Sequence, residues 1–227
     1  MMTNGSGLLF VLLAGACVAA GAACASGGTR AARADSPAPA GSLPAPTPVP
    51  AADGGAQLTR EEEELNLRPL KLPLSDPKVV VEKGARRLRL YAGGELVRVR
   101  RVALGFAPEG DKVKQGDGRT PEGEYRVCMK NEKSNYYLSL GLTYPNAEDA
   151  ERGLRDGLIT KGQHKSIKGA LDAGRCPPWN TALGGEIFIH GGGTARDWTW
   201  GCVALENPEI KELFDTLPKD TPVIIKP

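Results

Sequence analysis

Alternation of apolar and basic residues marks the first strands that the chain is expected to form. Val79-Val80-Val81 opens a β-rich run, and Arg87-Leu88-Arg89-Leu90 and Val97-Arg98-Val99-Arg100 both repeat with a period of two. This period is typical of half-buried strands, and Gly93-Gly94 between the two runs predicts a hairpin turn. The folded domain is therefore expected to begin near Lys78, with a sheet.

More β-rich runs follow, with three helical segments between and after them. The expected strands are Glu124–Cys128, Tyr136–Thr143, Glu186–His190 and Pro222–Lys226. The expected helices are Asn146–Leu158, Ser166–Ala173 and Asn207–Leu217, each supported by a capping, stop or proline signal at an end. The pattern predicts a mainly β domain with a helical insertion and a C-terminal helix.

The first 24 residues have the pattern of an export signal. The apolar run from Leu8 to Ala23 is shorter than the roughly 20 strongly apolar residues of a membrane-spanning helix. Cys24 follows small residues and resembles the lipidated first residue of a bacterial lipoprotein, with Cys17 as the alternative. Both cysteines could equally be plain signal residues. We expect export to the periplasm or cell envelope, with a membrane anchor if Cys24 carries a lipid.

A proline- and alanine-rich segment separates this signal from the β-rich region. Residues 35–55 offer almost nothing to pack, and such composition favours an extended, flexible linker. The run of four glutamates at 61–64 is expected to be a solvated helical turn or an acidic patch within it. The predicted organisation is a signal over 1–24, a linker over 25–77 and one catalytic domain over 78–227.

Charge excludes one class of partner. Lysine and arginine number 29 against 27 acidic residues, a formal charge of +2 that supplies no general field for holding nucleic acid. The 29 glycines are more than an average protein of this length carries, which suits a turn-rich β protein.

The segment most suggestive of chemistry is a histidine on an apolar run, followed twelve residues later by a Gly-Cys pair. His190 enters the glycines 191–193, and Gly201-Cys202 enters another apolar run. A cysteine is a strong nucleophile as thiolate, and an adjacent imidazole can lower its pKa from about 8.5 toward neutral. Gly201 would let an acyl group approach the backbone, where N–H groups around Cys202 could hold an oxyanion. Packing and coincidence are the alternative for a lone His with a lone Cys.

These residues resemble the active-site signature of the L,D-transpeptidase catalytic domain, or YkuD-type, family. That signature is a His-Gly pair, a spacer, then Ser or Thr, any residue, Gly, Cys and an aliphatic residue. His190-Gly191 and the run from Thr199 to Val203 fill every position. Upstream, the run from Asp117 to Tyr125 looks like the family's Thr-Pro-x-Gly loop, and the resemblance extends from about Lys78 to Pro227.

The resemblance implies a mainly β fold that is sandwich- or barrel-like, and acyl transfer on peptidoglycan stem peptides. Cys202 would attack the carbonyl after the third stem residue and expel the terminal D-alanine, and a neighbouring stem's amine would then form a 3-3 crosslink. His190 would accept the proton, Thr199 with a nearby carbonyl would orient it, and Gly201 completes the expected catalytic set. No metal or organic cofactor is implied. The expected substrate-binding residues are Arg119, Thr120, Gly191, Arg196, Trp198 and Trp200, and Trp179 is a further candidate for the cleft wall.

One departure from the family keeps alternatives open. Many members carry arginine two positions after the cysteine, where this chain has Ala204, and an arginine fork pairs well with a stem carboxylate. Arg119 or Arg196 could substitute, or the substrate could differ. The alternatives are attachment of proteins through the thioester, hydrolysis as an amidase or L,D-carboxypeptidase, and a non-catalytic, wall-anchoring lipoprotein.

Two further cysteines flank the helical insertion. In an oxidising compartment Cys128 and Cys176 are expected to form a disulfide. It would close a loop of nearly fifty residues, worth about 3 to 4 kcal/mol by loop entropy. Two separate buried thiols are the alternative.

Overall fold

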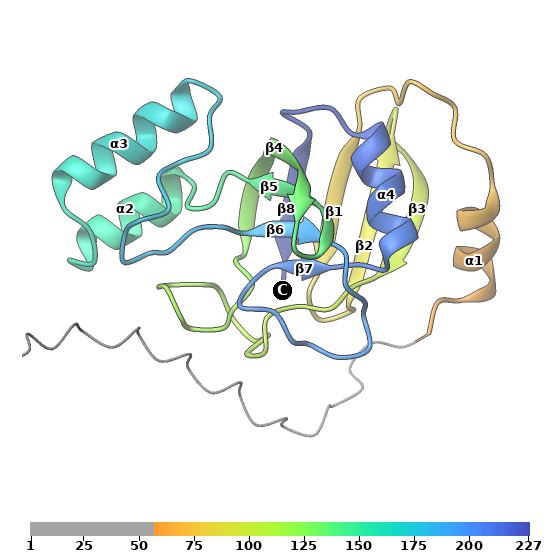
Figure 1. The fold of residues 1–227 in the computed structure, drawn as a ribbon, viewed down its shortest axis with the longest axis horizontal. Coiled ribbons are helices and arrows are strands. Elements are labelled where there is room, and N and C mark those ends of the chain that lie inside the picture. The colour runs from red at the N-terminus through yellow and green to blue at the C-terminus, as the bar shows by residue number, and fades with distance from the viewer. Residues whose placement is uncertain (1–56) are drawn as a thin grey trace, which may run out of the picture. The chain divides into compact units, whose positions relative to one another are not determined.

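The computed structural model describes residues 57–227, which form a mainly β domain with four helices. Eight strands join in one mixed sheet with the order β3-β2-β1-β8-β4-β5-β6-β7 (Figure 1). The predicted fold class, with its helical insertion and C-terminal helix, is confirmed. The strands are β1 (Lys78–Glu82), β2 (Arg87–Ala92), β3 (Glu95–Arg101), β4 (Gly123–Ser134), β5 (Tyr137–Leu142), β6 (Phe188–His190), β7 (Val203–Ala204) and β8 (Pro222–Lys226). The helices are α1 (Arg60–Leu67), α2 (Ala147–Arg155), α3 (Lys161–Asp172) and α4 (Asn207–Thr216).

The end of the chain completes the centre of the sheet. Strand β8 lies between β1, to which it is parallel, and β4, to which it is antiparallel. Its Val223 and Ile225 are buried in the same core as Val79 and Val81 of β1. An apolar strand flanked on both sides is typical of a sheet interior, so the core closes only after the last strand has paired.

The sheet curls so that its two edges approach each other. Ala103, just after β3, pairs with Ala204 of β7 through backbone hydrogen bonds of 3.0 and 2.8 Å. Two residues further, Gly105 pairs with Thr199. These bridges join the first and last strands of the sheet order and give the barrel-like curvature expected from the sequence.

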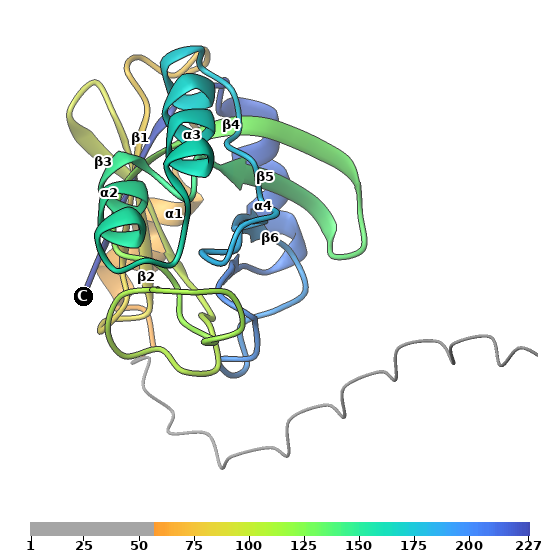
Figure 2. The same ribbon diagram turned by 90° about the vertical axis from the view of Figure 1, so that its left-hand side faces the viewer.

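Helix α4 packs on the inner face of this curled sheet. Its buried side chains Ile210, Leu213 and Phe214 belong to the main hydrophobic core, at the three- and four-residue spacing of one helix face. Helix α4 contacts β5 and β6, as the turned view shows, and leads along the chain from β7 toward β8 (Figure 2).

The helical insertion has a small core of its own. Helices α2 and α3 lie side by side (Figure 2), and Ala150, Ile159, Ile167 and Leu183 form a second apolar cluster in this insertion. A disulfide from Cys128 on β4 to Cys176 after α3 ties this insertion to the sheet, as expected from the sequence. Helix α3 begins five residues before its expected start at Ser166, because Thr160 caps it.

Helix α1 lies inside the region expected to be a flexible linker up to residue 77. Its Asn66 side chain donates to the Val99 carbonyl (2.6 Å) and accepts from the Val99 N–H (2.9 Å), adding a contact to the edge strand β3. Glu62 forms ion pairs with Arg87 and Arg89 of β2. The glutamate run is thus helical as expected, but it binds the sheet, so the ordered domain begins well before Lys78.

The expected signal over 1–24, the lipidation of Cys24 or Cys17 and the linker up to residue 56 lie outside the described residues. Within residues 57–227, no helix combines the length and apolar character needed to cross a bilayer.

Candidate active site

The β6–β7 ladder brings the two predicted catalytic residues to one region. His190, the last residue of β6, pairs with Ala204, and Ile189 pairs with Val203. Cys202 comes directly before β7, and its backbone leads into the register beside Phe188. The apolar residues 187–189 and 203–205 are buried in the core, except for Phe188, which is half-buried. His190 therefore lies at the end of one buried strand, and Cys202 lies just before the start of the next.

The thiol of Cys202 contacts the backbone of the β6 side. It accepts from the Phe188 N–H and donates to the Glu186 carbonyl, both at 3.4 Å. Glu186 has a φ of +55°, a left-handed conformation that is uncommon for a residue other than glycine. The strained backbone of Glu186 therefore holds its carbonyl toward the thiol.

The environment of Cys202 keeps its thiol protonated. The residue is half-buried, yet burial around the sulfur, the largest influence, raises the pKa of the Cys202 thiol to about 11. The Phe188 N–H and Lys112 act in the opposite direction, and Glu186 adds to the increase. The expectation that an imidazole lowers this pKa toward neutral is wrong, because burial raises it.

His190 is buried, with 2% of its surface exposed, and one of its ring nitrogens is fixed. Nδ1 lies 2.6 Å from the carbonyl oxygen of Gly191. Because a carbonyl can only accept, Nδ1 carries the proton, and Nε2 of the neutral ring is left as the acceptor. Burial lowers the pKa of His190, while the bond to Gly191 acts the other way. The neutral imidazole is therefore the resting form at neutral pH.

Among the described residues, no hydrogen bond joins the His190 imidazole to the Cys202 thiol. The direct contact expected from the sequence is absent because Sγ is held by Glu186 and Phe188. A rotation of the thiol about its Cα–Cβ bond, between staggered positions, would be needed to aim it elsewhere. Hydrogen bonds of catalytic groups often tighten only when substrate binds.

Thr199, Thr120 and Gly201 build the turn that presents Cys202. The Thr199 hydroxyl donates to the Cys202 carbonyl (2.8 Å) and accepts from the Gly201 N–H (3.1 Å). Thr120, fully buried, donates to the same carbonyl at 3.4 Å. Gly201 has a φ of +130°, and a Cβ there would lie 2.6 Å from the Arg119 carbonyl oxygen. Thr199 thus shapes the backbone under the cysteine. Thr199 was expected to orient His190, but among the described residues no hydrogen bond joins the two.

The loop between β3 and β4 supports this turn from the other side. Lys83 Nζ donates to the carbonyls of Gly110 and Thr120 and to Glu122, at 2.6 to 2.8 Å. Lys112, also buried, forms an ion pair with Asp117 at 2.7 Å. Burial acts to raise the pKa of Asp117, but Lys112 and three backbone N–H groups outweigh it and lower that pKa. The loop is therefore held by buried charges that are paired.

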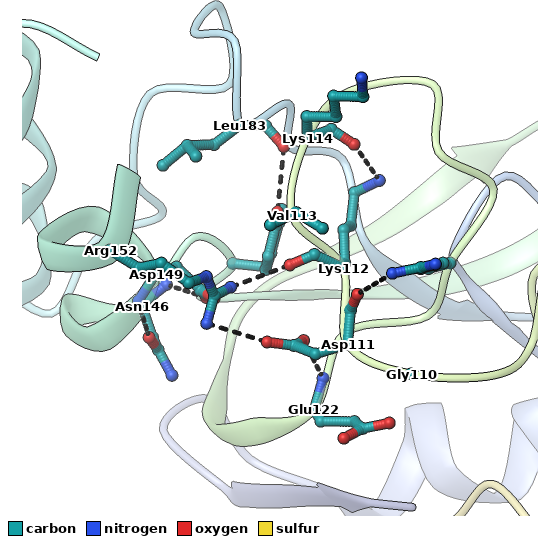
Figure 3. Close-up of polar contacts among 12 residues, drawn as sticks. Gly110, Asp111, Lys112, Val113, Lys114, Glu122, Asn146, Asp149, Arg152 and Leu183 are labelled. Atoms are coloured by element: carbon teal, nitrogen blue, oxygen red, sulfur yellow. Dashed lines mark hydrogen bonds and ion pairs between the residues drawn. The ribbon is translucent and has the colours of Figure 1, made fainter. Parts of the chain in front are cut away.

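Helix α2 is attached to the same loop, as Figure 3 shows. Arg152 pairs with Asp111 (2.9 Å) and Asp149 (2.7 Å) and donates to the Lys112 carbonyl (2.9 Å). The insertion, the loop and the Cys202 turn thus form one connected network of polar contacts.

The predicted substrate-binding residues separate into buried and exposed groups. Thr120 and Gly191 are buried in the backbone framework, and Trp198 packs edge-on against the His190 ring at 5.5 Å. Trp200 is 54% exposed and meets Phe106 in a T-shaped contact at 4.7 Å. Arg196 is exposed, and half-buried Arg119 donates to the Asp111 carbonyl at 3.3 Å. Trp179 packs on Phe188, at the end of β6 away from His190.

Sequence reasoning missed Tyr136, Glu186 and Phe106 as neighbours of the site. Tyr136 stacks on the His190 ring, with centroids 4.6 Å apart and planes 26° apart. None of the three belongs to the His-to-Cys signature, and the contacts depend on loops whose path the pattern does not give. Tyr136 and Glu186 each opened an expected strand, which was the one available signal.

Among residues 57–227, no group of three or more His, Cys, Asp or Glu side chains is placed to hold a metal ion. The site is therefore described by its thiol, its imidazole and the backbone groups around them.

Comparison with known proteins matches residues 76–225 to the L,D-transpeptidase catalytic domain (YkuD) family model. YqjB of Bacillus subtilis strain 168, provisionally named an L,D-transpeptidase, is 27% identical over 150 residues, 66% of this chain and 71% of that protein. Two solved structures are similar. The helical cell shape determining protein Pgp2 of Campylobacter jejuni is 20% identical (TM-score 0.43; 73% of this chain, 53% of that chain). An L,D-transpeptidase of Xylanimonas cellulosilytica is 18% identical (TM-score 0.38; 70% and 64%). The match thus spans between about half and two thirds of those solved chains.

Proposed function

Because the chain belongs to the L,D-transpeptidase catalytic domain family, we propose that it transfers acyl groups of peptidoglycan stem peptides through a thioester on Cys202. One observation carries the proposal. Of the described cysteines, only Cys202 is outside a disulfide, and it lies beside the strand whose last residue, His190, presents Nε2 as a proton acceptor.

The first half-reaction begins from a neutral thiol and a neutral imidazole. The thiol leaves the Glu186 carbonyl, His190 Nε2 takes its proton, and the thiolate attacks the carbonyl carbon after the third stem residue. The new C–S bond gives a tetrahedral oxyanion, which collapses as the C–N bond breaks and His190 returns the proton to the departing amine of the terminal D-residue. An acceptor amine then attacks the thioester and gives its proton to His190, the C–S bond breaks, and His190 passes the proton to the thiolate, which restores the thiol.

One backbone N–H is available to hold the developing oxyanion. The Gly201 N–H already donates to Thr199. The Cys202 N–H has no acceptor within hydrogen-bonding distance among the described residues. An N–H next to the nucleophile is the usual donor for the oxyanion of an acyl transfer, so we assign this role to Cys202 itself.

Hydrolysis by the same thioester is the second candidate function, and Ala204 bears on how either function would recognise its donor stem. Ala204 is fully buried and pairs with both His190 and Ala103, so this position presents no cation to the carboxylate of a stem peptide. With water as the acyl acceptor, the same thioester would give an L,D-carboxypeptidase or an amidase. Arg196, exposed on the loop between β6 and β7, is the cation that we propose in place of the missing arginine.

The products of stem peptides distinguish the two functions. We expect that the purified chain, incubated with tetrapeptide stems, gives crosslinked dimers by transfer or tripeptide monomers by hydrolysis, each resolved by mass. Cys202→Ala should remove both products, and Gly169→Ala, in open space on α3, should retain them. No product from the unmodified chain, or equal product from Cys202→Ala, would overturn the proposed function.

Export and lipid anchoring through Cys24 remain part of the proposal. The Cys128–Cys176 disulfide supports an oxidising compartment outside the cytoplasm. The mass of the mature N-terminus, isolated from the envelope of the producing bacterium, tests both points. A mature chain that begins at an acylated Cys24 agrees with them, and an intact Met1 contradicts them.

A further inference from the structure

The His190 imidazole lies between two aromatic rings. The Tyr136 ring stacks on it at 4.6 Å and 26°, and the Trp198 ring meets it at 5.5 Å and 68°. The two rings also contact each other, at 5.3 Å. Although Tyr136 is itself 48% exposed, the histidine beneath it is 2% exposed. Tyr136 therefore covers the imidazole on the side that would otherwise face solvent.

Hydrogen bonds hold the two aromatic residues beside the glycines that follow His190. The Gly191 N–H donates to the Tyr136 carbonyl at 3.1 Å. The Trp198 indole N–H donates to the Gly193 carbonyl at 3.1 Å, and the Trp198 backbone N–H donates to the Leu104 carbonyl at 3.1 Å. The Trp198 ring is thus fixed by its own indole N–H, and the Tyr136 ring is placed by its backbone and by its stacking on the imidazole.

Glycines 191 and 192 make this arrangement sterically feasible. A Cβ at Gly191 would lie 2.9 Å from the Tyr136 carbonyl oxygen and 2.4 Å from the Asn207 side chain. A Cβ at Gly192 would lie 3.1 Å from the Trp198 ring. The close approach of both aromatic residues therefore requires small residues directly after the histidine.

We propose that Tyr136 and Trp198 are positioning residues, an aromatic clamp that fixes the plane of the His190 imidazole and keeps water off it. With the plane fixed, Nδ1–H stays on the Gly191 carbonyl and Nε2 keeps one direction for proton transfer. The inference rests on the proposed function for its kinetic consequence. Trp198 was expected from the sequence to bind substrate. In this proposal its role is to position the His190 imidazole.

Shielding by the rings accounts for the neutral state of the imidazole. Ser139 of β5 and Ala204 of β7 pair with His190 from either side, and Cys202 is the titratable group on the neighbouring segment. Among the described residues, no charged side chain forms a hydrogen bond or ion pair with the ring. Burial is the dominant cause of the lowered His190 pKa, so removing a ring should admit water and move that pKa upward.

The chain offers a matched control for measuring this effect. Tyr137, next to Tyr136 on the same hairpin and 45% exposed, provides the control substitution. NMR titration of the His190 imidazole in the full chain reports its pKa without any substrate.

Tyr136→Ala should raise the His190 pKa and lower kcat by about tenfold to a hundredfold with KM little changed, because the geometry of proton transfer is lost and substrate contacts are not. Tyr136→Phe, which keeps the ring, should restore both values. Tyr137→Ala should change neither value. Tyr136→Leu is the second variant if Tyr136→Ala does not fold.

An unchanged His190 pKa in Tyr136→Ala and Tyr136→Leu would overturn the clamp. So would a rise in KM at constant kcat, which is the result of losing a substrate contact. Failure of the proposed function looks different: the pKa responds as described, but the unmodified chain has no activity on stem peptides.

Discussion

The resting state of Cys202 leads to a prediction opposite to that for a preactivated thiol. With a pKa of about 11, about one thiol in 3,000 is ionised at pH 7.5, against about one in ten for an unperturbed thiol of pKa 8.5. This lowers the thiolate fraction by about 300-fold. A more basic thiolate is also more nucleophilic, by about tenfold over this range at a Brønsted slope of 0.4 to 0.5. Reaction with a small disulfide reagent should therefore be about 30-fold slower than for a free cysteine.

Peptide-level mass spectrometry provides the assay, because the chain has other thiols at Cys17 and Cys24. We expect the rate of modification at Cys202 to rise about tenfold per pH unit from pH 7 to beyond pH 10. His190→Ala should leave this resting rate nearly unchanged, since no hydrogen bond joins the imidazole to the thiol. A plateau between pH 6 and 8 that disappears in His190→Ala would refute the reasoning, because it would show a thiolate–imidazolium pair at rest.

Three further predictions test the framework around the site. Gly201→Ala should lower the free energy of unfolding, measured by urea denaturation, by about 3 kcal/mol or more, because its positive φ is strained for alanine and the added Cβ overlaps the Arg119 carbonyl oxygen. Gly169→Ala, in open space on α3, is the control and should raise this free energy by up to about 1 kcal/mol. A loss below about 0.5 kcal/mol for Gly201→Ala, the size of a surface substitution, would contradict the steric argument. Replacing Cys128 and Cys176 together by serine should lower stability by about 4 kcal/mol, since the bridge closes a loop of 48 residues, and an unchanged melting curve would oppose this. Arg152→Ala should increase amide hydrogen exchange in residues 110–117 while exchange in β1 and β8 stays constant. If exchange in residues 110–117 does not increase relative to β1 and β8, α2 does not hold the loop.

The periodic parts of the fold could be predicted from the sequence. The alternation in β2 and β3 gave both strands and the turn between them, because one face of each is buried and the other carries arginines. Strand β7 has only two residues, too few for a period to show. Helix α1 has no buried residue at all, so its attachment through Asn66 and Glu62 leaves no apolar pattern to read.

The site was predictable as far as its signature and no further. Spacing in the sequence placed Cys202 and His190 on neighbouring segments, because both follow or precede apolar runs that pair as strands. It did not give the state of the thiol, which depends on how closely the Glu186 and Phe188 backbone surrounds the sulfur. Nor did it give Tyr136, whose position depends on the long β4–β5 hairpin that extends from the sheet (Figure 2).

The most direct test of the central claim is the mass of the acylated chain. The protein is mixed with a tetrapeptide stem, quenched in acid within the first turnovers, and digested for mass spectrometry. The account predicts a tripeptidyl adduct on Cys202, formed far more slowly in His190→Ala and absent in Cys202→Ala. Turnover of the stem by Cys202→Ala, or an adduct on any other residue, would contradict it.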